Sequence, residues 1–396
     1  MGGEHMFCDL HAHYPMHLVP GFDHAAYELV TSRRARARLL DRVRGRMLGI
    51  AGRIGNYESF ASGPRVTVPK LRDGRVGVAL SVLYSPFDEM DLSLRYGSPP
   101  QERYFHTLLR QLDAVESELA AEHAGRAMVA RNPAELDAAI AAGEVALVHC
   151  VEGAFHVGAT PAAMEEGVER LAARGMAYLT IAHLFWRSVA TNAPAIPFLP
   201  DPVYRLLFPQ PDVGLAELGR AAVRACVRER VLVDVSHMSS EALRETLALL
   251  DQLDPAGEVP LIASHVGYRF GRQEYNLAAE DISRVAHRGG VVGVILSEHQ
   301  AADGLRHRHT KTFEQSFEIV CRHIDRICEI TGSHEHSAIG SDLDGFIKPT
   351  LAGLSDEACM ARLEDSLVER YGAEDAGLIA SGNVLRLLRG HWRGAV

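Results

Sequence analysis

The sequence is poor in the features that mark secreted and membrane-spanning proteins. Its six cysteines lie far apart and form no Cys-x-x-Cys pair, so no disulfide framework is indicated and a reducing compartment is favoured. No apolar run approaches the roughly 18–20 residues that a transmembrane helix needs. No charged segment with a long apolar run after it precedes the first expected strand. We therefore expect a cytoplasmic protein with no membrane partner.

The chain also lacks a surplus of positive charge. Its formal net charge is −10, whereas a nucleic-acid-binding surface needs a basic face. Arginines do gather at 33–46, but leucines at helical spacing share that stretch, which favours an exposed helix face. We expect no nucleic-acid partner.

A Gly-x-Gly-x-x-Gly turn is missing as well, although strand-like and helix-like segments alternate along the chain. A doubly wound open sheet would predict such a turn after an early strand. The expected strands are mostly continuous apolar runs, as in parallel sheets covered on both faces. They lie at 6–10, 76–83, 144–150, 177–182, 230–235, 260–264, 290–296 and 337–341. Amphipathic helices are expected at 107–123, 162–174, 214–229, 240–251 and 312–330.

This alternation predicts an α/β fold of the (β/α)8 TIM-barrel type. We expect residues 1–396 to form a single domain with its active site at the C-terminal rim of the strands. Two stretches, at about 14–75 and 183–213, exceed the usual loop length. Long loops over a barrel mouth commonly shape a substrate pocket.

What the sequence does contain is a series of metal-ligand side chains where the expected strands end. FCDLHAH at 7–13 carries His11 and His13, whose i, i+2 spacing places them on one face of a strand. ALVHCVEG, VLVDVSH and PLIASH deliver Glu152, His237 and His265. Neutral imidazoles and carboxylates suit zinc and related divalent ions. We expect His11 and His13 to hold one ion, His237 and His265 a second, and Glu152 to bridge them.

The chain has 20 histidines, so a structural role is the default for any one of them taken alone. The shared strand-end position favours the binuclear site. In SAIGSDLDG at 337–345, Asp342 and Asp344 are open to a plain turn role. Asp342 lies nearer the strand end, so it is the candidate to take a proton from the attacking water. His183, just after the fourth strand, is the candidate to stabilise the oxyanion.

With these residues in place, the chain resembles the membrane (renal) dipeptidase family of zinc peptidases, in the amidohydrolase superfamily. The matching stretches are DLHAHYP, KLRDGRVGVALSVLYSP, VHCVEGAF, YLTIAHLFWRSVATN, GLAELGRAAVRACVRERVLVDVSHMSSEAL, PLIASHVGYR, IGSDLDG and SGNVLRLL. The resemblance implies a (β/α)8 barrel, two zinc ions and hydrolysis of a dipeptide amide bond, and it suggests a homodimer. It places the family's roles on the same residues: His11 and the residue two later, Glu152, His237 and His265 for zinc, Asp342 for catalysis and His183 for the transition state.

The chain departs from the family pattern in two places. The first motif usually reads His-x-Asp, whereas this chain has His-Ala-His, so His13 replaces a carboxylate. Losing that negative charge would make the ions more electrophilic or the first site weaker. The resemblance also implies an arginine for the substrate carboxylate. Arg272 is the nearer match and Arg269 the alternative, with Asn276 matching the asparagine that follows, but the local spacing does not align cleanly.

The expected activity is hydrolysis of a dipeptide or similar small amide by a zinc-dependent enzyme. Two alternatives stay open. The substrate could instead be an N-acyl amino acid, a lactone or a phosphoester. The protein could also be a non-catalytic barrel whose first metal site is degenerate.

Overall fold

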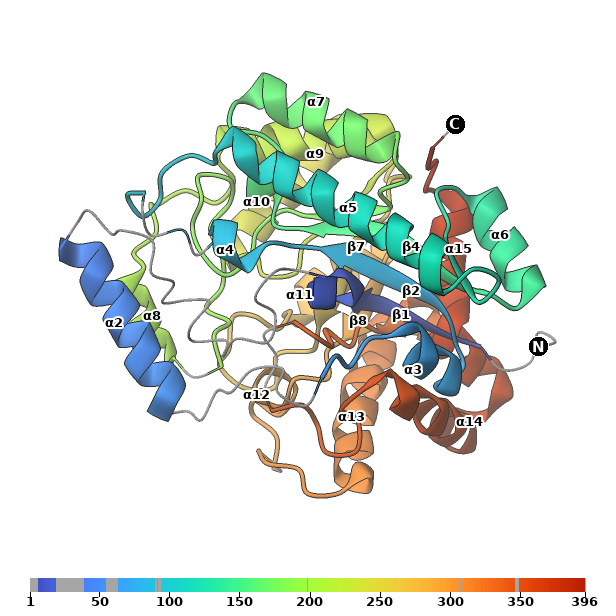
Figure 1. Cartoon of the computed structure of the whole chain (residues 1–396). Coiled ribbons are helices and arrows are strands. Elements are labelled where there is room, and N and C mark those ends of the chain that lie inside the picture. Colours follow the sequence, from blue (N-terminus) through green and yellow to red (C-terminus); the bar gives the residue numbers. More distant parts are fainter. Residues whose placement is uncertain are drawn as a thin grey trace.

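Short apolar segments of the chain pair as parallel strands in the computed structural model of the protein (Figure 1). The structure describes residues 6–18, 39–54, 63–89, 91, 94–197, 199–306, 308–345 and 349–395. Its strands are β1 (Phe7–Ala12), β2 (Val76–Leu83), β3 (Ala127–Val129), β4 (Val145–Glu152), β5 (Tyr178–Thr180), β6 (Leu232–Asp234), β7 (Leu261–Val266), β8 (Val291–Val294) and β9 (Ser337–Ile339).

The sheet closes on itself. Its strand order is β2-β1-β9-β8-β7-β6-β5-β4-β3, and β2 also pairs with β4. All strands except β3 therefore form a closed barrel of eight parallel strands, and the predicted (β/α)8 fold is confirmed. Each predicted strand overlaps one of these eight.

No strand was expected at β3, which is only three residues long. Its Met128 pairs with Ala146 of β4, while Ala146 also pairs with Val78 of β2. β3 therefore lies on the edge of β4 opposite β2. β5 takes up that same edge farther along, at Val151 and Glu152.

Helices surround the barrel, and the five predicted ones are present (Figure 1). The α-helices are α2 (Leu39–Ile54), α3 (Val68–Asp73), α4 (Pro86–Glu89), α5 (Glu102–Glu122), α6 (Pro133–Ala142), α7 (Pro161–Ala172), α8 (Asp201–Leu207), α9 (Glu217–Glu229), α10 (Ser240–Leu253), α11 (Ala279–His287), α12 (Glu298–Ala301), α13 (Phe313–Thr331), α14 (Met360–Gly377) and α15 (Asn383–Gly390). Short 3₁₀ segments lie at Tyr14–Leu18, Ala154–His156, His334–His336 and Glu357–Cys359, and a short π-helix lies at Leu378–Gly382.

Side-chain caps begin several of these helices. Thr160 accepts a hydrogen bond from the backbone N–H of Ala163 at the start of α7, and Pro161 occupies the first helical position. Ser239 and Thr312 cap α10 and α13 in the same way. Each cap gives a partner to an N–H group that the helix itself leaves unpaired. The caps fix where the chain turns from barrel rim to outer helix.

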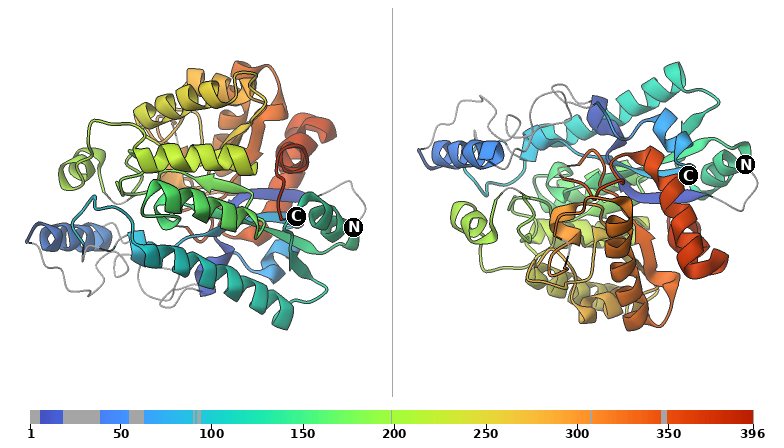
Figure 2. Two further views of the ribbon diagram at one scale, coloured as in Figure 1. Left: turned by 90° about the horizontal axis from the view of Figure 1, so that it is seen from above. Right: turned by 90° about the horizontal axis from the view of Figure 1, so that it is seen from below.

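The two long stretches differ in what the structure describes. Within 14–75 lie one 3₁₀ turn, α2 and α3, whereas 19–38 and 55–62, with part of the arginine-rich stretch, fall outside the described residues. The stretch 183–213 includes α8 and a cluster of aromatic rings, in which Phe185 and Phe208 have centroids 4.6 Å apart. Figures 1 and 2 show α2 and α8 together at the side toward which the strands end, with α14 and α15 at the opposite side.

One hydrophobic core extends from Phe7 to Trp392. Every residue of β4 is buried, as expected for a strand with side chains on one face and helices on the other. The single-domain assignment stays a prediction. Among the described helices, none combines the length and apolar character needed to cross a bilayer.

Candidate metal centre

The C-terminal ends of the barrel strands bring the predicted metal-ligand and catalytic side chains to one place. They are His11 and His13 at the end of β1, Glu152 at the end of β4, His183 after β5, His237 after β6, His265 in β7 and Asp342 after β9. All seven are at most 7% exposed. The rim that the fold predicted to be functional therefore holds a buried cluster of imidazoles and carboxylates.

Glu152 lies at the centre of this cluster. Its Oε1 is 3.4 Å from Nε2 of His11 and 3.3 Å from Nε2 of both His237 and His265. Its Oε2 is 3.4 Å from Nε2 of His13 and 3.1 Å from Nε2 of His183. The carboxylate thus faces imidazoles from both halves of the expected site, which is the position that a bridging ligand requires.

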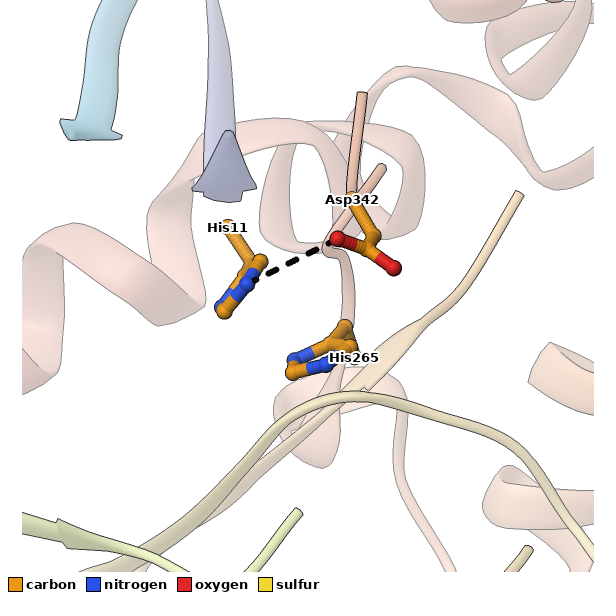
Figure 3. A group of neighbouring side chains, drawn as sticks. All are labelled: His11, His265 and Asp342. Carbon is orange, nitrogen blue, oxygen red and sulfur yellow. Dashed lines mark ion pairs between the residues drawn. The ribbon is translucent and has the colours of Figure 1, made fainter. Parts of the chain in front are cut away.

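The remaining distances link the cluster into overlapping groups. Nε2 of His237 and His265 are 2.9 Å apart, and those of His11 and His13 are 3.3 Å apart. Asp342 Oδ1 lies 3.1 Å from His13 Nε2 and 3.8 Å from His11 Nε2. Figure 3 shows His11, His265 and Asp342 turned toward one another from three separate segments. Their ligand atoms lie within 4.8 Å of one another, as do those of His11, His13 and Glu152.

The charge state of these groups fits a divalent cation. Burial lowers the pKa of His11 and of His237 to about 4, with neighbouring imidazoles adding to the shift. Burial alone would raise the pKa of Glu152, but His183 and His11 hold it well below its usual range. Burial would also lower the pKa of His265, but Glu152 and Asp342 outweigh it and raise that pKa. His11 and His237 thus present neutral imidazoles to an ionised carboxylate, the kind of donor set that zinc and similar ions bind.

Hydroxyl groups behind the cluster orient the rings of His11 and His265. His11 Nδ1 lies 2.7 Å from the Tyr178 hydroxyl and 3.1 Å from Ser264 Oγ, and Ser264 Oγ is also 2.7 Å from His265 Nδ1. Asp234 Oδ2 accepts a hydrogen bond from Ser264 at 2.7 Å. Because each Nδ1 is engaged on the outer side, each Nε2 faces the centre, as in metal sites where a second hydrogen bond fixes the ring.

The backbone at the strand ends is unusual. His237 and Asp342 have φ values of 65° and 56°, in the left-handed region that residues other than glycine rarely adopt. Such conformations are unfavourable and cluster at functional sites, where the surrounding structure holds them. They turn both side chains into the cluster immediately after β6 and β9.

Comparison with known families identifies the chain. The sequence profile described as "Membrane dipeptidase (Peptidase family M19)" matches residues 36–391, which is most of the chain. The chain belongs to this family. The profile match begins after β1, so His11 and His13 lie outside it.

The curated relatives of this membrane dipeptidase family member match part of the chain. The chain is 27% identical over 258 residues to the uncharacterized dipeptidase C965.12 of Schizosaccharomyces pombe, covering 63% of this chain and 55% of that protein. The uncharacterized dipeptidase C3A11.10c of the same organism is 29% identical over 182 residues, covering 44% and 39%. The chain spans about half the length of the curated relatives it matches.

Solved structures share the fold over nearly the whole chain. A metallo peptidase from Rhodobacter sphaeroides, liganded with a phosphinate mimic of the dipeptide L-Ala-D-Ala, has a TM-score of 0.71 at 19% identity and covers 98% of this chain and 99% of its own. The probable dipeptidase PvdM from Pseudomonas aeruginosa has a TM-score of 0.64 at 18% identity, covering 92% and 97%. At this identity the likeness concerns the barrel fold.

His183 has a partner on each side of its ring. Nε2 faces Glu152, and Nδ1 lies 2.6 Å from Glu89 Oε2. Burial lowers the pKa of His183, but the two carboxylates outweigh it and raise the pKa to about 10. His183 is therefore a buried imidazolium beside the centre, suited to stabilise negative charge.

A small pocket opens over the cluster. Its lining consists of His13, Glu152, His183, Leu184, Ala195, His237, Tyr275, Gln300 and Asp342. Tyr275 donates its hydroxyl proton to the backbone oxygen of His265, and Gln300 Nε2 donates to that of Ala195. The pocket thus combines the candidate metal-binding groups with a small apolar and neutral polar wall.

The predicted substrate-binding residues are not among the described residues that line this pocket. Arg269 donates from Nε and Nη2 to the backbone oxygens of Asn276 and Glu274, so its guanidinium holds its own loop. The Arg272 side chain is exposed. Asn276 is buried and donates to the backbone oxygen of Gln300, a lining residue. A role for Arg272 or Arg269 in holding a substrate carboxylate stays a prediction.

Asp344 serves the loop rather than the cluster. Its Oδ2 accepts hydrogen bonds from the backbone N–H groups of Arg65 and Val66 at 2.8 and 2.9 Å. Asp342, by contrast, reaches His13. Of the two aspartates, Asp342 is thus the one beside the cluster, and it is also the one nearer the strand end.

Sequence reasoning missed Glu89, Tyr275 and Gln300. Glu89 ends α4, directly after β2, so the position just past a strand was a usable signal for it. Tyr275 and Gln300 sit in segments beyond β7 and β8 with no metal-ligand pattern of their own. Only the folded structure shows that Tyr275 and Gln300 both line the pocket.

Proposed function

We propose that the chain is a binuclear metal-dependent hydrolase that cleaves the amide bond of a dipeptide or a similar small substrate. The observation that carries this proposal is the position of Glu152, whose two oxygens face imidazoles from β1, β6 and β7 at 3.3–3.4 Å. Membership of the membrane dipeptidase family supports the same reaction class.

The donor set suggests how two ions would be held. His11 and His13 would bind one ion, His237 and His265 the other, and Glu152 both. When bound, such ions polarise the scissile carbonyl and make a water molecule acidic enough to attack near neutral pH. Zinc is the proposed metal because imidazole nitrogens dominate the site.

The remaining residues supply proton transfer and charge stabilisation. Asp342, whose pKa is lowered by the hydrogen bond from His13 and by His265 in spite of burial, is ionised and can accept the proton of the attacking water. It then returns that proton to the leaving amine. The imidazolium of His183 donates a hydrogen bond from Nε2 to the oxyanion that forms as the carbonyl is attacked.

The proposal extends to the setting of the enzyme. Cytoplasmic location is proposed from the scattered cysteines, which indicate no disulfide framework. A homodimer is proposed from the family resemblance alone.

Hydrolysis of a dipeptide panel by zinc-loaded protein tests the function, and the panel should include L,D pairs such as L-Ala-D-Ala. We expect turnover of at least one dipeptide, abolished by a chelator and restored by zinc. Activity only on N-acyl amino acids, lactones or phosphoesters would refute the dipeptide claim and retain the hydrolase. Absence of bound metal after zinc loading would favour a non-catalytic barrel.

A further inference from the structure

Glu89 is a buried carboxylate that touches the rim cluster through His183. It ends α4 and is 0% exposed. Its Oε2 accepts hydrogen bonds from His183 Nδ1 at 2.6 Å and from the Tyr84 hydroxyl at 2.7 Å, while Oε1 accepts from the backbone N–H of Phe185 at 3.0 Å. Three donors therefore converge on one carboxylate, which is the pattern of a buried ionised group.

This contact settles which nitrogen of His183 faces the pocket. An ionised carboxylate only accepts hydrogen bonds, so Nδ1 of His183 must carry a proton. Nε2 then points the opposite way, into the pocket and to within 3.1 Å of Glu152. The Tyr84 ring packs edge-on against the imidazole, with centroids 4.6 Å apart and an interplanar angle of 73°, which limits rotation of the ring.

A purely structural role explains this arrangement poorly. The loop after β5 is already held to α4 without the Glu89 carboxylate, because the Arg187 guanidinium donates a hydrogen bond to the backbone oxygen of Glu89. Burying an ionised carboxylate costs several kcal/mol, by rough estimate, unless its partners recover it. A neutral side chain could hold the loop at lower cost. A charge at this position is better explained by what it does to His183.

We propose that Glu89 is a positioning residue for the reaction, which fixes the orientation of His183 with Nδ1 protonated so that Nε2 faces the substrate oxyanion. The inference rests on the proposed function for its chemical consequence. The orientation itself is a property of the free protein and is testable without turnover.

The Glu89→Gln variant tests the consequence. Glutamine keeps the volume, but one of its terminal atoms is a donor and must face the N–H of either His183 or Phe185. We expect kcat for L-Ala-D-Ala to fall about 10- to 100-fold, as for other residues that orient a reacting group. KM and zinc content should stay near wild type. Affinity for a phosphinate mimic of L-Ala-D-Ala should fall with kcat, because its tetrahedral oxyanion uses the same donor.

Glu118→Gln is a matched control. Glu118 also accepts from a tyrosine and a histidine, Tyr14 and His17, both at 2.9 Å, but it lies outside the pocket lining. We expect this variant to keep wild-type kcat and phosphinate affinity. Wild-type kcat and phosphinate affinity in Glu89→Gln would overturn the proposal. A fall in kcat that is accompanied by a rise in KM and by losses of zinc content and thermal stability would also overturn it, in favour of a structural role.

Imidazole NMR of the wild-type protein tests the orientation directly, even if the variant does not fold. We expect a strongly downfield Nδ1–H proton for His183, assigned by its loss in His183→Asn, and an Nδ1 without a proton would refute the inference. If the wild type neither hydrolyses a dipeptide nor binds the phosphinate, the proposed function fails. The NMR result then still decides whether Glu89 orients His183.

Discussion

Replacing Glu152 by glutamine is the perturbation that bears most heavily on the proposed centre. The substitution keeps the size of the side chain and removes the negative charge that faces the imidazoles of both halves of the site. A unit charge about 3.3 Å away feels roughly 5 kcal/mol of attraction at an effective dielectric constant of about 20. A divalent ion near the same oxygens feels more, so metal affinity should weaken by about 10³-fold or more.

The assay combines metal analysis with hydrolysis of L-Ala-D-Ala. We expect Glu152→Gln protein, dialysed at a zinc concentration that saturates the wild type, to retain less than half of the wild-type zinc and no measurable turnover. Glu166→Gln is the control, since Glu166 is 69% exposed on α7 and should leave both quantities unchanged. Full zinc content together with wild-type turnover in Glu152→Gln would refute the assignment of Glu152 as the bridging ligand.

Three further predictions concern Asp342 and His13 in the same centre and His323 outside it. Asp342→Asn should retain zinc but lose about 10²- to 10⁴-fold in kcat, as expected for loss of a general base; equal losses of zinc and activity would instead make Asp342 a ligand. His13→Asp restores a negative charge at the first site, so chelator competition should show zinc held at least about tenfold more tightly, and weaker binding would contradict the charge argument. His323 is buried away from the centre, with its pKa lowered from 6.5 to about 4 by burial. As the pH falls, His323 is protonated in the unfolded chain before it is protonated in the folded protein. The stability that the neutral, buried His323 ring contributes is therefore fully present above about pH 6.5 and is lost as the pH falls toward 4. Between pH 7.5 and 5, the loss should be about 2 kcal/mol in urea unfolding, and His323→Gln should remove that part of the pH dependence; an unchanged slope would show that His323 is not responsible.

The sequence predicted the barrel because its strands are buried on both faces. Segments such as 145–151 are mostly apolar, as is typical of parallel strands that lie between helices. The three-residue β3 escaped detection because so short a segment has no period of its own.

The residues of the candidate site could likewise be predicted where they end recognisable strands, but not where they lie on short helices. Glu152, His237 and His265 could be predicted from the sequence because each lies where a recognisable strand ends. Glu89 and Gln300 contribute to the rim through short helices, α4 and α12, whose positions over the barrel depend on tertiary packing. The direction of a side chain in such a segment cannot be read from spacing along the chain.

The arginines illustrate a different limit. The family resemblance implies an arginine soon after His265 that holds a substrate carboxylate, and this made Arg272 and Arg269 candidates. In the structure, the Arg269 guanidinium is occupied by backbone oxygens of its own loop. Which hydrogen bonds a long side chain makes is decided by the folded loop, and motif position alone does not reveal it.

Zinc titration of the metal-free protein, with hydrolysis of L-Ala-D-Ala measured at each step, tests the central claim most directly. The account predicts no turnover without metal and an increase that reaches a plateau at about two equivalents of zinc per chain, as for a two-metal site. Bound zinc at that ratio with no hydrolysis of any dipeptide, or hydrolysis that is unaffected by removing the metal, would contradict it.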